Sequence, residues 1–331
     1  CRDDRFDYTH PVDGSDPATD WHGLIPLAEL PQVLNPPNGW VMNTNDWPWS
    51  AAGGHSPKAA DFPRYMDSFG ENPRGRHATE LLTGASGFSL PKLIAAAFDN
   101  RQPAFERLVP RLVHDFDVLP AGDARKARLT GPVALLRDWD GRWGSASMPN
   151  TLATFWGDTL WDRTHASATQ AGVSTWDFMA RDDQAAARLA ALDTAVTRLE
   201  QDFGSWGVAW GEVNRFQRLD GAITPHFDDA APSIPVPFGS ARWGSLASFG
   251  AHRWPGTRKY YGSSGNSFVA VVAFGSRVEA RAISAGGASG DPASAHFRDQ
   301  AERYASGDLR AVRFYPEDIS AHAVRRYHPG E

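Results

Sequence analysis

The stretch around Asn43 and Asn45 has the residue types best suited to chemistry on an acyl group. Residues 43–46 read N-T-N-D and follow the short apolar run 40–42, for which we predict a strand. Side-chain amides on a turn at a strand end can direct N–H donors into a cleft, where they stabilise a developing oxyanion. Asparagine is also a common turn former, and spacing alone favours that structural role.

An arginine provides the second candidate. Residues 74–76 read R-G-R and precede a helical stretch that begins near His77. Arg74 there could bind a carboxylate or orient another side chain of a site. A solvated or structurally paired surface arginine is the alternative, and spacing alone favours it.

Cys1 offers a different chemistry. A terminal cysteine can act as a nucleophile with its own α-amine as the base. The residues that follow, R-D-D-R at positions 2–5, form a poor strand, whereas autocatalytic cysteine hydrolases tend to continue from the nucleophile into one. A self-contained Cys1 hydrolase is therefore kept as an alternative. Since Cys1 is the single cysteine, no internal disulfide can form.

Histidine and acidic residues give no cofactor pattern. The runs H-D-F-D at 114–117 and H-F-D-D at 226–229 lack the spacing and partners of a zinc site. Asp182 and Asp183 are better explained as an exposed pair than as a catalytic one. The sequence has no phosphate-binding loop, dinucleotide fingerprint or G-x-S-x-G elbow. No cofactor is therefore expected for catalysis.

The elements that must position these residues fall into three regions. Residues 1–75 are rich in Pro, Gly, Asn and Trp, which indicates turns between short extended pieces. Residues 76–204 carry apolar stripes at helical spacing over 105–116, 151–165 and 189–203. Pro110 should kink or break the first of these helices, and Gly204 should end the last.

Residues 205–331 return to strands. We predict a buried strand over 267–274, a hairpin turn at Gly275-Ser276 and a half-exposed strand over 278–283. Asp291-Pro292 should begin a helix that ends near Gly307. A helical segment inserted between two parts of one sheet gives this order, and so do two independent domains.

Composition limits the function classes. The chain has 331 residues, of which 41% are hydrophobic and 22% charged, so it can bury a sizeable core. A net charge of −6 with scattered Lys and Arg argues against nucleic-acid binding. No run approaches the roughly 18 apolar residues that span a bilayer. The 13 Trp also allow a non-catalytic ligand-binding protein, with several Trp exposed along one groove.

Four segments in order resemble the penicillin acylase family of N-terminal-nucleophile hydrolases. Residues 20–26 (D-W-H-G-L-I-P) resemble its W-x-G-x-x-P segment, and 35–45 (N-P-P-N-G-W-V-M-N-T-N) its N-P-x-x-G-aromatic-x-x-N-x-N stretch. Residues 74–78 (R-G-R-H-A) resemble its R-x-R helix entry. Residues 289–300 (S-G-D-P-A-S-A-H-F-R-D-Q) resemble its S-G-x-x-x-S-x-x-aromatic-x-D-Q signature.

The resemblance implies an α+β fold, the αββα sandwich of N-terminal-nucleophile hydrolases, here partial and with a helical insertion. Residues 1–75 would begin the core with the turn-rich active-site segment, 76–204 would form the insertion, and 205–331 the remaining strands and C-terminal helices. It further implies hydrolysis of an N-acyl amide through an acyl-enzyme. The role of oxyanion donor falls on Asn45, and that of organising arginine on Arg74.

The resemblance also carries expectations about what accompanies this chain. Asn45 comes too early for the family's nucleophile strand to precede it, so we expect the α chain and the first part of the β chain to be separate from this sequence. Substrates would be small N-acyl amides such as β-lactams or acyl-homoserine lactones, and the location periplasmic or secreted. A structural calcium ion is a family feature whose ligands cannot be assigned here. Ala288 departs from the usual glutamine of the Gly-Gln-Ser approach.

Overall fold

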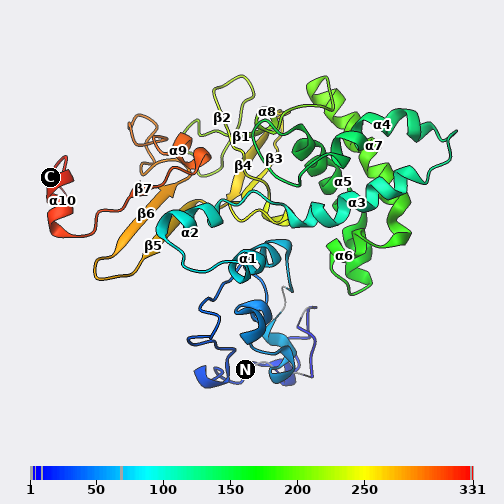
Figure 1. The fold of residues 1–331 in the computed structure, drawn as a ribbon. Coiled ribbons are helices and arrows are strands. Elements are labelled where there is room, and N and C mark those ends of the chain that lie inside the picture. The colour runs from blue at the N-terminus through cyan, green and yellow to red at the C-terminus, as the bar shows by residue number, and fades with distance from the viewer. Residues whose placement is uncertain (1–2, 4, 9, 68–69, 329, 331) are drawn as a thin grey trace.

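The computed structural model describes residues 3, 5–8, 10–67, 70–328 and 330. Helices and two β-sheets are combined in one chain, which confirms the α+β class. Figure 1 shows the turn-rich N-terminal segment on one side of α1, the helices α3–α7 gathered at one end, and the strands β5–β7 towards the other. The C-terminal helix α10 lies beyond the sheet formed by β5–β7.

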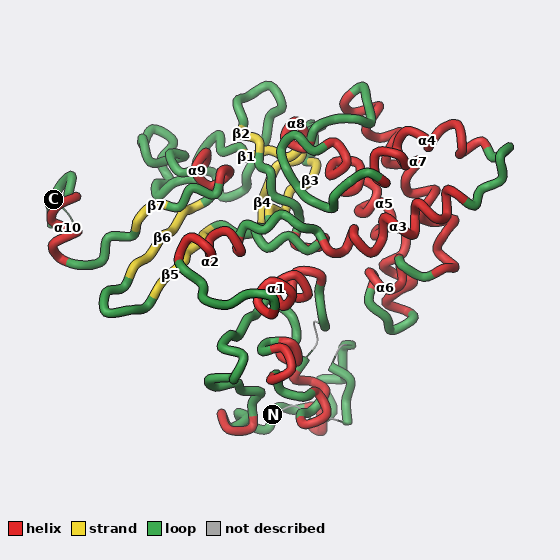
Figure 2. The backbone as a smooth tube through the Cα atoms, in the orientation of Figure 1, coloured by secondary structure: helices red, strands yellow, loops and turns green. Residues whose placement is uncertain are grey.

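The N-terminal segment is built from turns and single-turn helices. The described residues before α1 form six 3₁₀ helices, at Pro17–Thr19, Leu27–Glu29, Pro48–Ser50, Gly53–His55, Ala59–Asp61 and Arg64–Met66. Figure 2 shows them as short red turns in green loop. The strand predicted at 40–42 is wrong. Met42 N donates one hydrogen bond to Ala51 O (2.8 Å), but 3₁₀ turns on the neighbouring segment offer no ladder for it to pair with.

Helices dominate the middle of the chain. They are α1 (Pro73–Thr83), α2 (Leu90–Ala97), α3 (Pro103–Asp117), α4 (Ala124–Arg137), α5 (Met148–Gln170), α6 (Thr175–Met179) and α7 (Ala185–Phe203), with a 3₁₀ turn at Asp182–Gln184. The three predicted apolar stripes lie in α3, α5 and α7. Gly204 ends α7 in the left-handed conformation (φ 79°), as expected. The helix α3 runs through Pro110 without a break, although proline removes the hydrogen bond that a backbone N–H would donate to Glu106 O.

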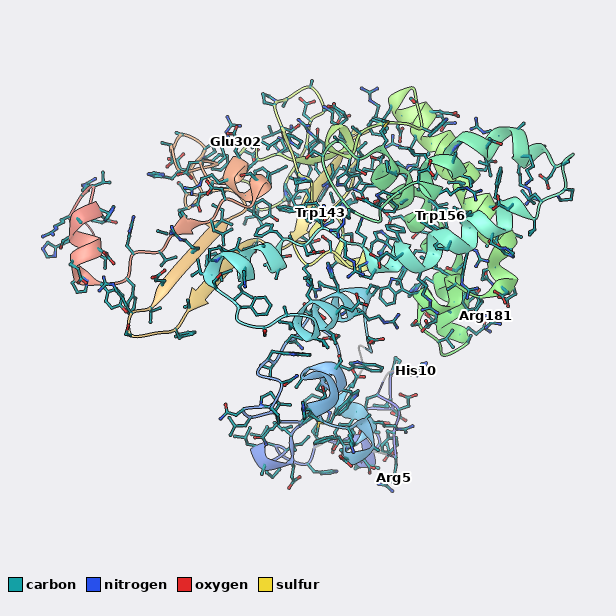
Figure 3. All side chains as sticks on the ribbon, viewed as in Figure 1. Arg5, His10, Trp143, Trp156, Arg181 and Glu302 are labelled. Atoms are coloured by element: carbon teal, nitrogen blue, oxygen red, sulfur yellow. The ribbon has the colours of Figure 1, made fainter. Side chains whose placement is uncertain are left out.

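The helical core packs around large side chains from α3, α5 and α7. Phe105, Leu152, Trp156 and Leu192 are buried in it. An ion pair is buried with them, in which Arg188 Nε donates to Asp115 Oδ2 at 2.6 Å. Figure 3 places Trp156 inside this end of the molecule, with Arg181 at its surface.

The first sheet follows the helices. A short helix α8 (Trp210–Val213) leads into β1 (Asn214–Phe216), followed by β2 (Ile234–Pro235), the 3₁₀ helix η8 (Ala241–Trp243), β3 (Phe249–Arg253) and β4 (Tyr260–Gly265). The strand order is β2-β1-β4-β3, with β1 parallel to β4 and the other pairs antiparallel.

The second sheet contains β5 (Phe268–Ala273), β6 (Glu279–Ser284) and β7 (Arg310–Ala311), in the order β5-β6-β7. The predicted hairpin at 275–276 is confirmed by the antiparallel pairing of β5 with β6. Helix α9 (Ala301–Ser306) packs against β6, and α10 spans Pro316–His322.

Two predictions for this region were wrong. The strand at 267–274 is buried on one face only: Val271 is 5% exposed, whereas Phe268 is 60% exposed, because α2 covers a single face of β5. The helix predicted from Asp291 to near Gly307 starts at Ala301 instead. Asp291 accepts a hydrogen bond from Ala293 N (2.9 Å), and this turn is followed by further turns instead of a helix.

Candidate active site

Asn45 lies in a turn that fixes its backbone and leaves its side chain exposed. Its φ is 59°, in the left-handed region that asparagine tolerates better than most residues. The Asn45 backbone N–H donates to Asn43 Oδ1 at 3.0 Å. The turn-forming role that spacing favoured is thus carried by the side chain of Asn43, and the amide of Asn45 remains available for other contacts.

Arg74 reaches this turn from the first turn of α1. The helix begins with Pro73, and Asn72 caps it by accepting from Gly75 N at 2.8 Å. Arg74 Nη2 then donates to Asn45 Oδ1 at 2.6 Å and also to Thr44 O. The sequence placed these residues in separate segments, and the fold brings their side chains into contact.

This contact determines which way the Asn45 amide faces. A guanidinium group has only donors, so the Asn45 atom beside it must be the carbonyl oxygen. The Nδ2 hydrogens then point away from Arg74. No residue in the described part of the chain accepts a hydrogen bond from Asn45 Nδ2. Two N–H donors are therefore held ready for a ligand.

Gly75 allows the turn to approach the helix closely. A Cβ at this position would lie 2.1 Å from Asp46 Oδ2 and 3.0 Å from Thr44 Oγ1. Asp46 is buried, and its Oδ1 accepts from Thr44 N at 3.2 Å. Sequence reasoning did not identify Gly75 as part of the site, although the R-G-R spacing contained the signal.

The electrostatics of the site favour an electron-rich ligand. Burial lowers the pKa of the Arg74 guanidinium, and the nearby Asp46 carboxylate opposes this effect. An arginine stays protonated in either case, so a positive charge sits behind the Asn45 amide. Arg76, the second arginine of the motif, turns away and binds Glu71 Oε2 through Nε at 2.7 Å.

Both predicted residues line one cavity of about 400 Å³. Its other walls come from the segment before and within η8 and from the facing ends of β3 and β4; they are Ser240, Ala241, Ser248, Gly250, Ser264, Gly265 and Asn266. Sequence reasoning missed these walls because no local motif marks Ser240 to Asn266, which lie 195 to 221 positions beyond Asn45 in the chain. Among the residues that the structure describes, no Asp, Glu, His or Lys lines the cavity.

His77 joins the two halves of this cavity. It is completely buried in α1, with Nδ1 2.8 Å from Gly244 O and Nε2 2.9 Å from Asp99 Oδ1. Gly244 follows η8, so this contact holds the helix carrying Arg74 against the segment that provides Ser240 and Ala241.

The other sequence candidates lie elsewhere. Cys1 is outside the described residues. Asp182 and Asp183 form surface ion pairs with Arg111 and Arg181. Over the described ranges, no group of three or more His, Cys, Asp or Glu is arranged to hold a metal ion.

Two further observations bear on alternative functions. Of the 13 Trp, Trp21 is the one that is largely exposed (72%), which argues against a groove lined with exposed tryptophans. In the described part of the chain, no helix is both long and apolar enough to cross a bilayer.

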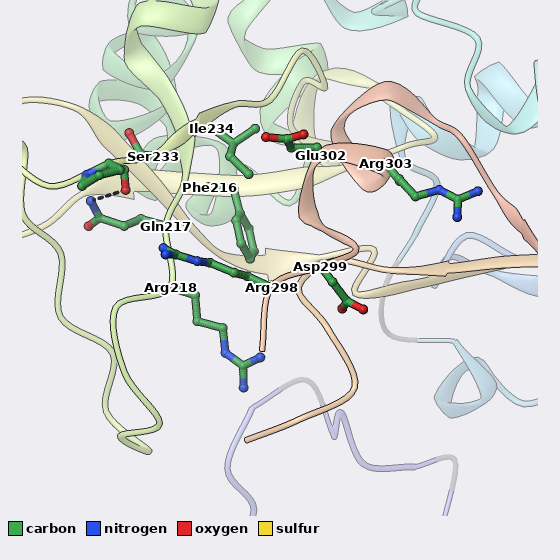
Figure 4. A pocket seen from close by; sticks show the side chains of 10 residues that line it. Phe216, Gln217, Arg218, Ser233, Ile234, Arg298, Asp299, Glu302 and Arg303 are labelled. Carbon is green, nitrogen blue, oxygen red and sulfur yellow. Dashed lines mark hydrogen bonds between the residues drawn. The ribbon is translucent and has the colours of Figure 1, made fainter. Parts of the chain in front are cut away.

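A second hollow, of about 550 Å³, lies between β1, β2 and α9. Figure 4 shows Phe216, Arg298 and Glu302 around it. Arg218 stacks over the Phe297 ring at 4.0 Å and donates to Phe297 O, and Asp299 binds His296. The Arg218 contacts fasten the 291–300 loop to the segment that follows β1, and the Asp299–His296 pair lies within the loop. Asn45 and Arg74 do not line this hollow.

Comparisons with known proteins agree with the motifs. A family model described as penicillin amidase matches residues 2–321. The fold is similar to that of a thermostable penicillin G acylase from Alcaligenes faecalis, with a TM-score of 0.56 and 17% sequence identity. The similarity covers 99% of this chain and 63% of that one, so the chain spans less than two thirds of the length of this neighbour.

Proposed function

Because the chain belongs to the penicillin amidase family, we propose that it forms part of an amidohydrolase that cleaves an N-acyl amide through an acyl-enzyme. One observation carries the proposal: Arg74 binds the carbonyl oxygen of Asn45, and the amide N–H donors of Asn45 are left free beside a cavity. Family membership supports the class of reaction, and this geometry supports the role of the two residues.

In the proposed mechanism, a nucleophile attacks the carbonyl carbon of the substrate amide, and its oxygen gains negative charge. Asn45 Nδ2 donates a hydrogen bond to that oxygen as the charge develops. Arg74 orients the amide, and its positive charge strengthens the donor. Because the donors are already in position, no reorganisation is needed at the moment of reaction.

The nucleophile and its base, a terminal side chain and its own α-amine, belong in this proposal to the first part of the β chain of the same precursor, and the α chain is a further partner. Support comes from the cavity, whose serines have no His, Lys, Asp or Glu beside them among the lining residues to act as base. Exposed apolar side chains at β5 also support a missing partner segment. Phe268 in β5 is 60% exposed and Phe274, directly after it, is 86% exposed, and exposed apolar surface of this kind is typical of an interaction site.

At the level of architecture, we assign the two sheets to a partial αββα sandwich, with residues 76–204 as its helical insertion. The proposed substrates are small N-acylated molecules such as β-lactams or acyl-homoserine lactones. We also propose a periplasmic or secreted location, because members of this family are commonly exported. A structural calcium ion is part of the proposal by resemblance to the family alone, and we assign no ligands to it here.

The test is to express this chain together with the preceding part of its natural reading frame and to supply an N-acyl amide such as phenylacetyl-4-nitroanilide. The proposal predicts release of the amine and a transient mass increase equal to one acyl group on a single serine or cysteine. Processed protein that folds but neither releases amine nor becomes acylated, across a panel of acyl chains, would contradict it.

A further inference from the structure

His77 has a hydrogen-bond acceptor in front of each of its two ring nitrogens. Nδ1 lies 2.8 Å from Gly244 O, and Nε2 lies 2.9 Å from Asp99 Oδ1. Both distances are those of a hydrogen bond. A backbone carbonyl oxygen and an ionised carboxylate offer only lone pairs, so each contact needs a hydrogen on the imidazole nitrogen. A neutral imidazole carries one such hydrogen, whereas an imidazolium carries two.

The surroundings of the ring leave it little freedom to avoid these acceptors. The His77 side chain is completely buried, so neither ring nitrogen can turn to solvent. Gly244 is held in place as well, because its φ is 104° and a Cβ there would lie 2.6 Å from Pro103 Cδ, at the start of α3. A ring nitrogen without a hydrogen would therefore place its lone pair against that of a fixed, buried acceptor, which costs free energy.

Asp99 supplies the negative charge that a buried imidazolium requires. Its Oδ1 also accepts from Arg101 N at 3.0 Å, and Arg142 Nη1 lies 3.9 Å from the same oxygen. These are the partners expected of an ionised carboxylate. The guanidinium of Arg101 is itself bound by Glu80 and Glu106. A buried charge is tolerated when it is both paired and hydrogen-bonded, and a doubly protonated ring at this position meets both conditions.

The two hydrogen bonds of the ring connect the helix of the candidate site to its surroundings. His77 lies three residues after Arg74 in α1, so the two side chains are neighbours on the helix surface. Gly244 directly follows η8, and residues 240–241 of this segment line the cavity. The bond from Nδ1 therefore ties the helix that carries Arg74 to a wall of the cavity, and the bond from Nε2 ties it to Asp99, beyond the end of α2.

We propose that His77 is held as a doubly protonated imidazolium and that it is a positioning residue for the reaction. With both hydrogens in place, the ring fixes α1 against the cavity wall, so that Arg74 keeps the Asn45 amide directed at the reacting carbonyl. Loss of either hydrogen bond lets α1 shift, and the amide donor shifts with it. The kinetic part of this inference rests on the proposed function, whereas the hydrogens on the ring can be counted without any substrate.

The first measurement counts the ring hydrogens by NMR. The full chain, labelled with the NMR-active nitrogen isotope in its histidine rings, is studied at about pH 7.5, where a free histidine side chain with its pKa of about 6.5 is mostly neutral. Nitrogen–proton correlations across two bonds distinguish the imidazolium from either neutral tautomer, and the signal that is missing from His77→Gln identifies His77. We expect both ring nitrogens to be protonated in the wild type. In Asp99→Asn, which removes the compensating charge, we expect one.

The second measurement is the turnover of an N-acyl amide by the processed enzyme. His77→Gln has one donor nitrogen in place of two, so it cannot satisfy both acceptors. Its kcat should fall by roughly ten- to hundredfold, because a displacement of about 1 Å at a catalytic group can cost that much, and KM should change much less. His114→Gln, at an exposed position near the end of α3, is the matched control and should keep kcat within about twofold. Circular dichroism checks that each variant is folded.

Three outcomes overturn the inference: a wild-type His77 ring with a single hydrogen at that pH, an Asp99→Asn ring that keeps both, and a folded His77→Gln enzyme with the kcat of the wild type. If His77→Gln does not fold, Asp99→Asn replaces it in identifying the ring signal and in the turnover assay, where it should also lower kcat. Failure of the proposed function would look different, because a processed enzyme that is never acylated leaves the number of ring hydrogens unchanged.

Discussion

Replacing Gly75 by alanine tests how the 43–46 turn is held against α1. The added Cβ would lie 2.1 Å from Asp46 Oδ2 and 3.0 Å from Thr44 Oγ1. An ordinary carbon–oxygen contact is longer than about 3.2 Å, so the Asp46 carboxylate must move by about 1 Å. Asp46 is buried and bonded to Thr44 N, and for this reason the displacement will be passed to the turn that carries Asn45.

Two opposing contributions determine how much Gly75→Ala changes the free energy of unfolding. Alanine is favoured over glycine inside a helix by about 1 kcal/mol, which would stabilise α1. Overpacking a tight contact costs about 1–3 kcal/mol. The clash here is with a buried carboxylate, so we expect the second term to exceed the first and Gly75→Ala to be destabilising by about 1–2 kcal/mol.

The assay is urea unfolding of the wild type and two alanine variants, followed by circular dichroism. Gly54→Ala is the matched control, because its Cβ would meet nothing within 4 Å and its φ is not positive. That variant should be neutral or stabilised by up to about 1 kcal/mol. The Asn45 side-chain amide signal should shift in the Gly75→Ala variant alone. Equal stability of the two variants, with an unmoved Asn45 signal, would refute the reasoning.

Three further predictions concern the framework of the site. His77→Ala leaves Gly244 O and the Asp99 carboxylate without their buried partner, so unfolding free energy should fall by about 2–5 kcal/mol in urea titrations; a loss under 1 kcal/mol would contradict this. Asp115→Ala leaves the buried Arg188 guanidinium without its carboxylate partner and should lower the free energy of unfolding by about 3–5 kcal/mol in the same assay. A variant as stable as the wild type would show that the ion pair is not needed for stability. Burial raises the pKa of Asp158 to about 6, although the charge of Arg242 opposes this shift. Between about pH 4 and 6 the native state therefore binds more protons than the unfolded chain. The contribution of Asp158 to wild-type stability falls as the pH rises through that range. Asp158→Asn removes that dependence, and its melting temperature relative to wild type should therefore rise between pH 4.5 and 7.5; a constant difference would contradict the assignment.

Much of the helical part could be predicted from the sequence. The stripes in α3, α5 and α7 repeat at helical spacing over three or more turns, and a glycine at position 204 adopts the left-handed conformation that ends α7. The β5–β6 hairpin was also predicted, because its turn separates two short apolar runs. These patterns lie within short segments of the sequence. Such patterns predict the observed helix or strand correctly when the tertiary contacts of the segment favour the same structure.

The failures have a common physical origin. An apolar run such as 268–273 predicts a strand, but whether both of its faces are covered depends on what packs against it. Asp291-Pro292 has the composition of a helix start, yet the loop that follows is fastened by Arg218 to Phe297 and forms turns instead. The apolar run 40–42 had no partner strand. In each case a non-local contact, or its absence, outweighed the local preference.

The candidate site shows the same division. Asn45 and Arg74 stood out in the sequence because each belongs to a compact motif. The opposite wall of their cavity, including Ser248 and Asn266, is formed by a hairpin about 200 residues away and carries no local motif. The requirement for glycine at position 75 became visible only when the turn and the helix were seen in contact.

The most direct test of the account is the turnover of the processed enzyme when Asn45 is replaced. Asn45→Asp keeps the oxygen that Arg74 binds and removes the Nδ2 donor, and Asn45→Ala removes both. Loss of one oxyanion donor costs about 10²–10³ in kcat. We expect a loss of this size in both variants, with KM changing much less and with wild-type folding by circular dichroism. A kcat within about threefold of wild type in either folded variant would contradict the claim that Asn45 stabilises the oxyanion.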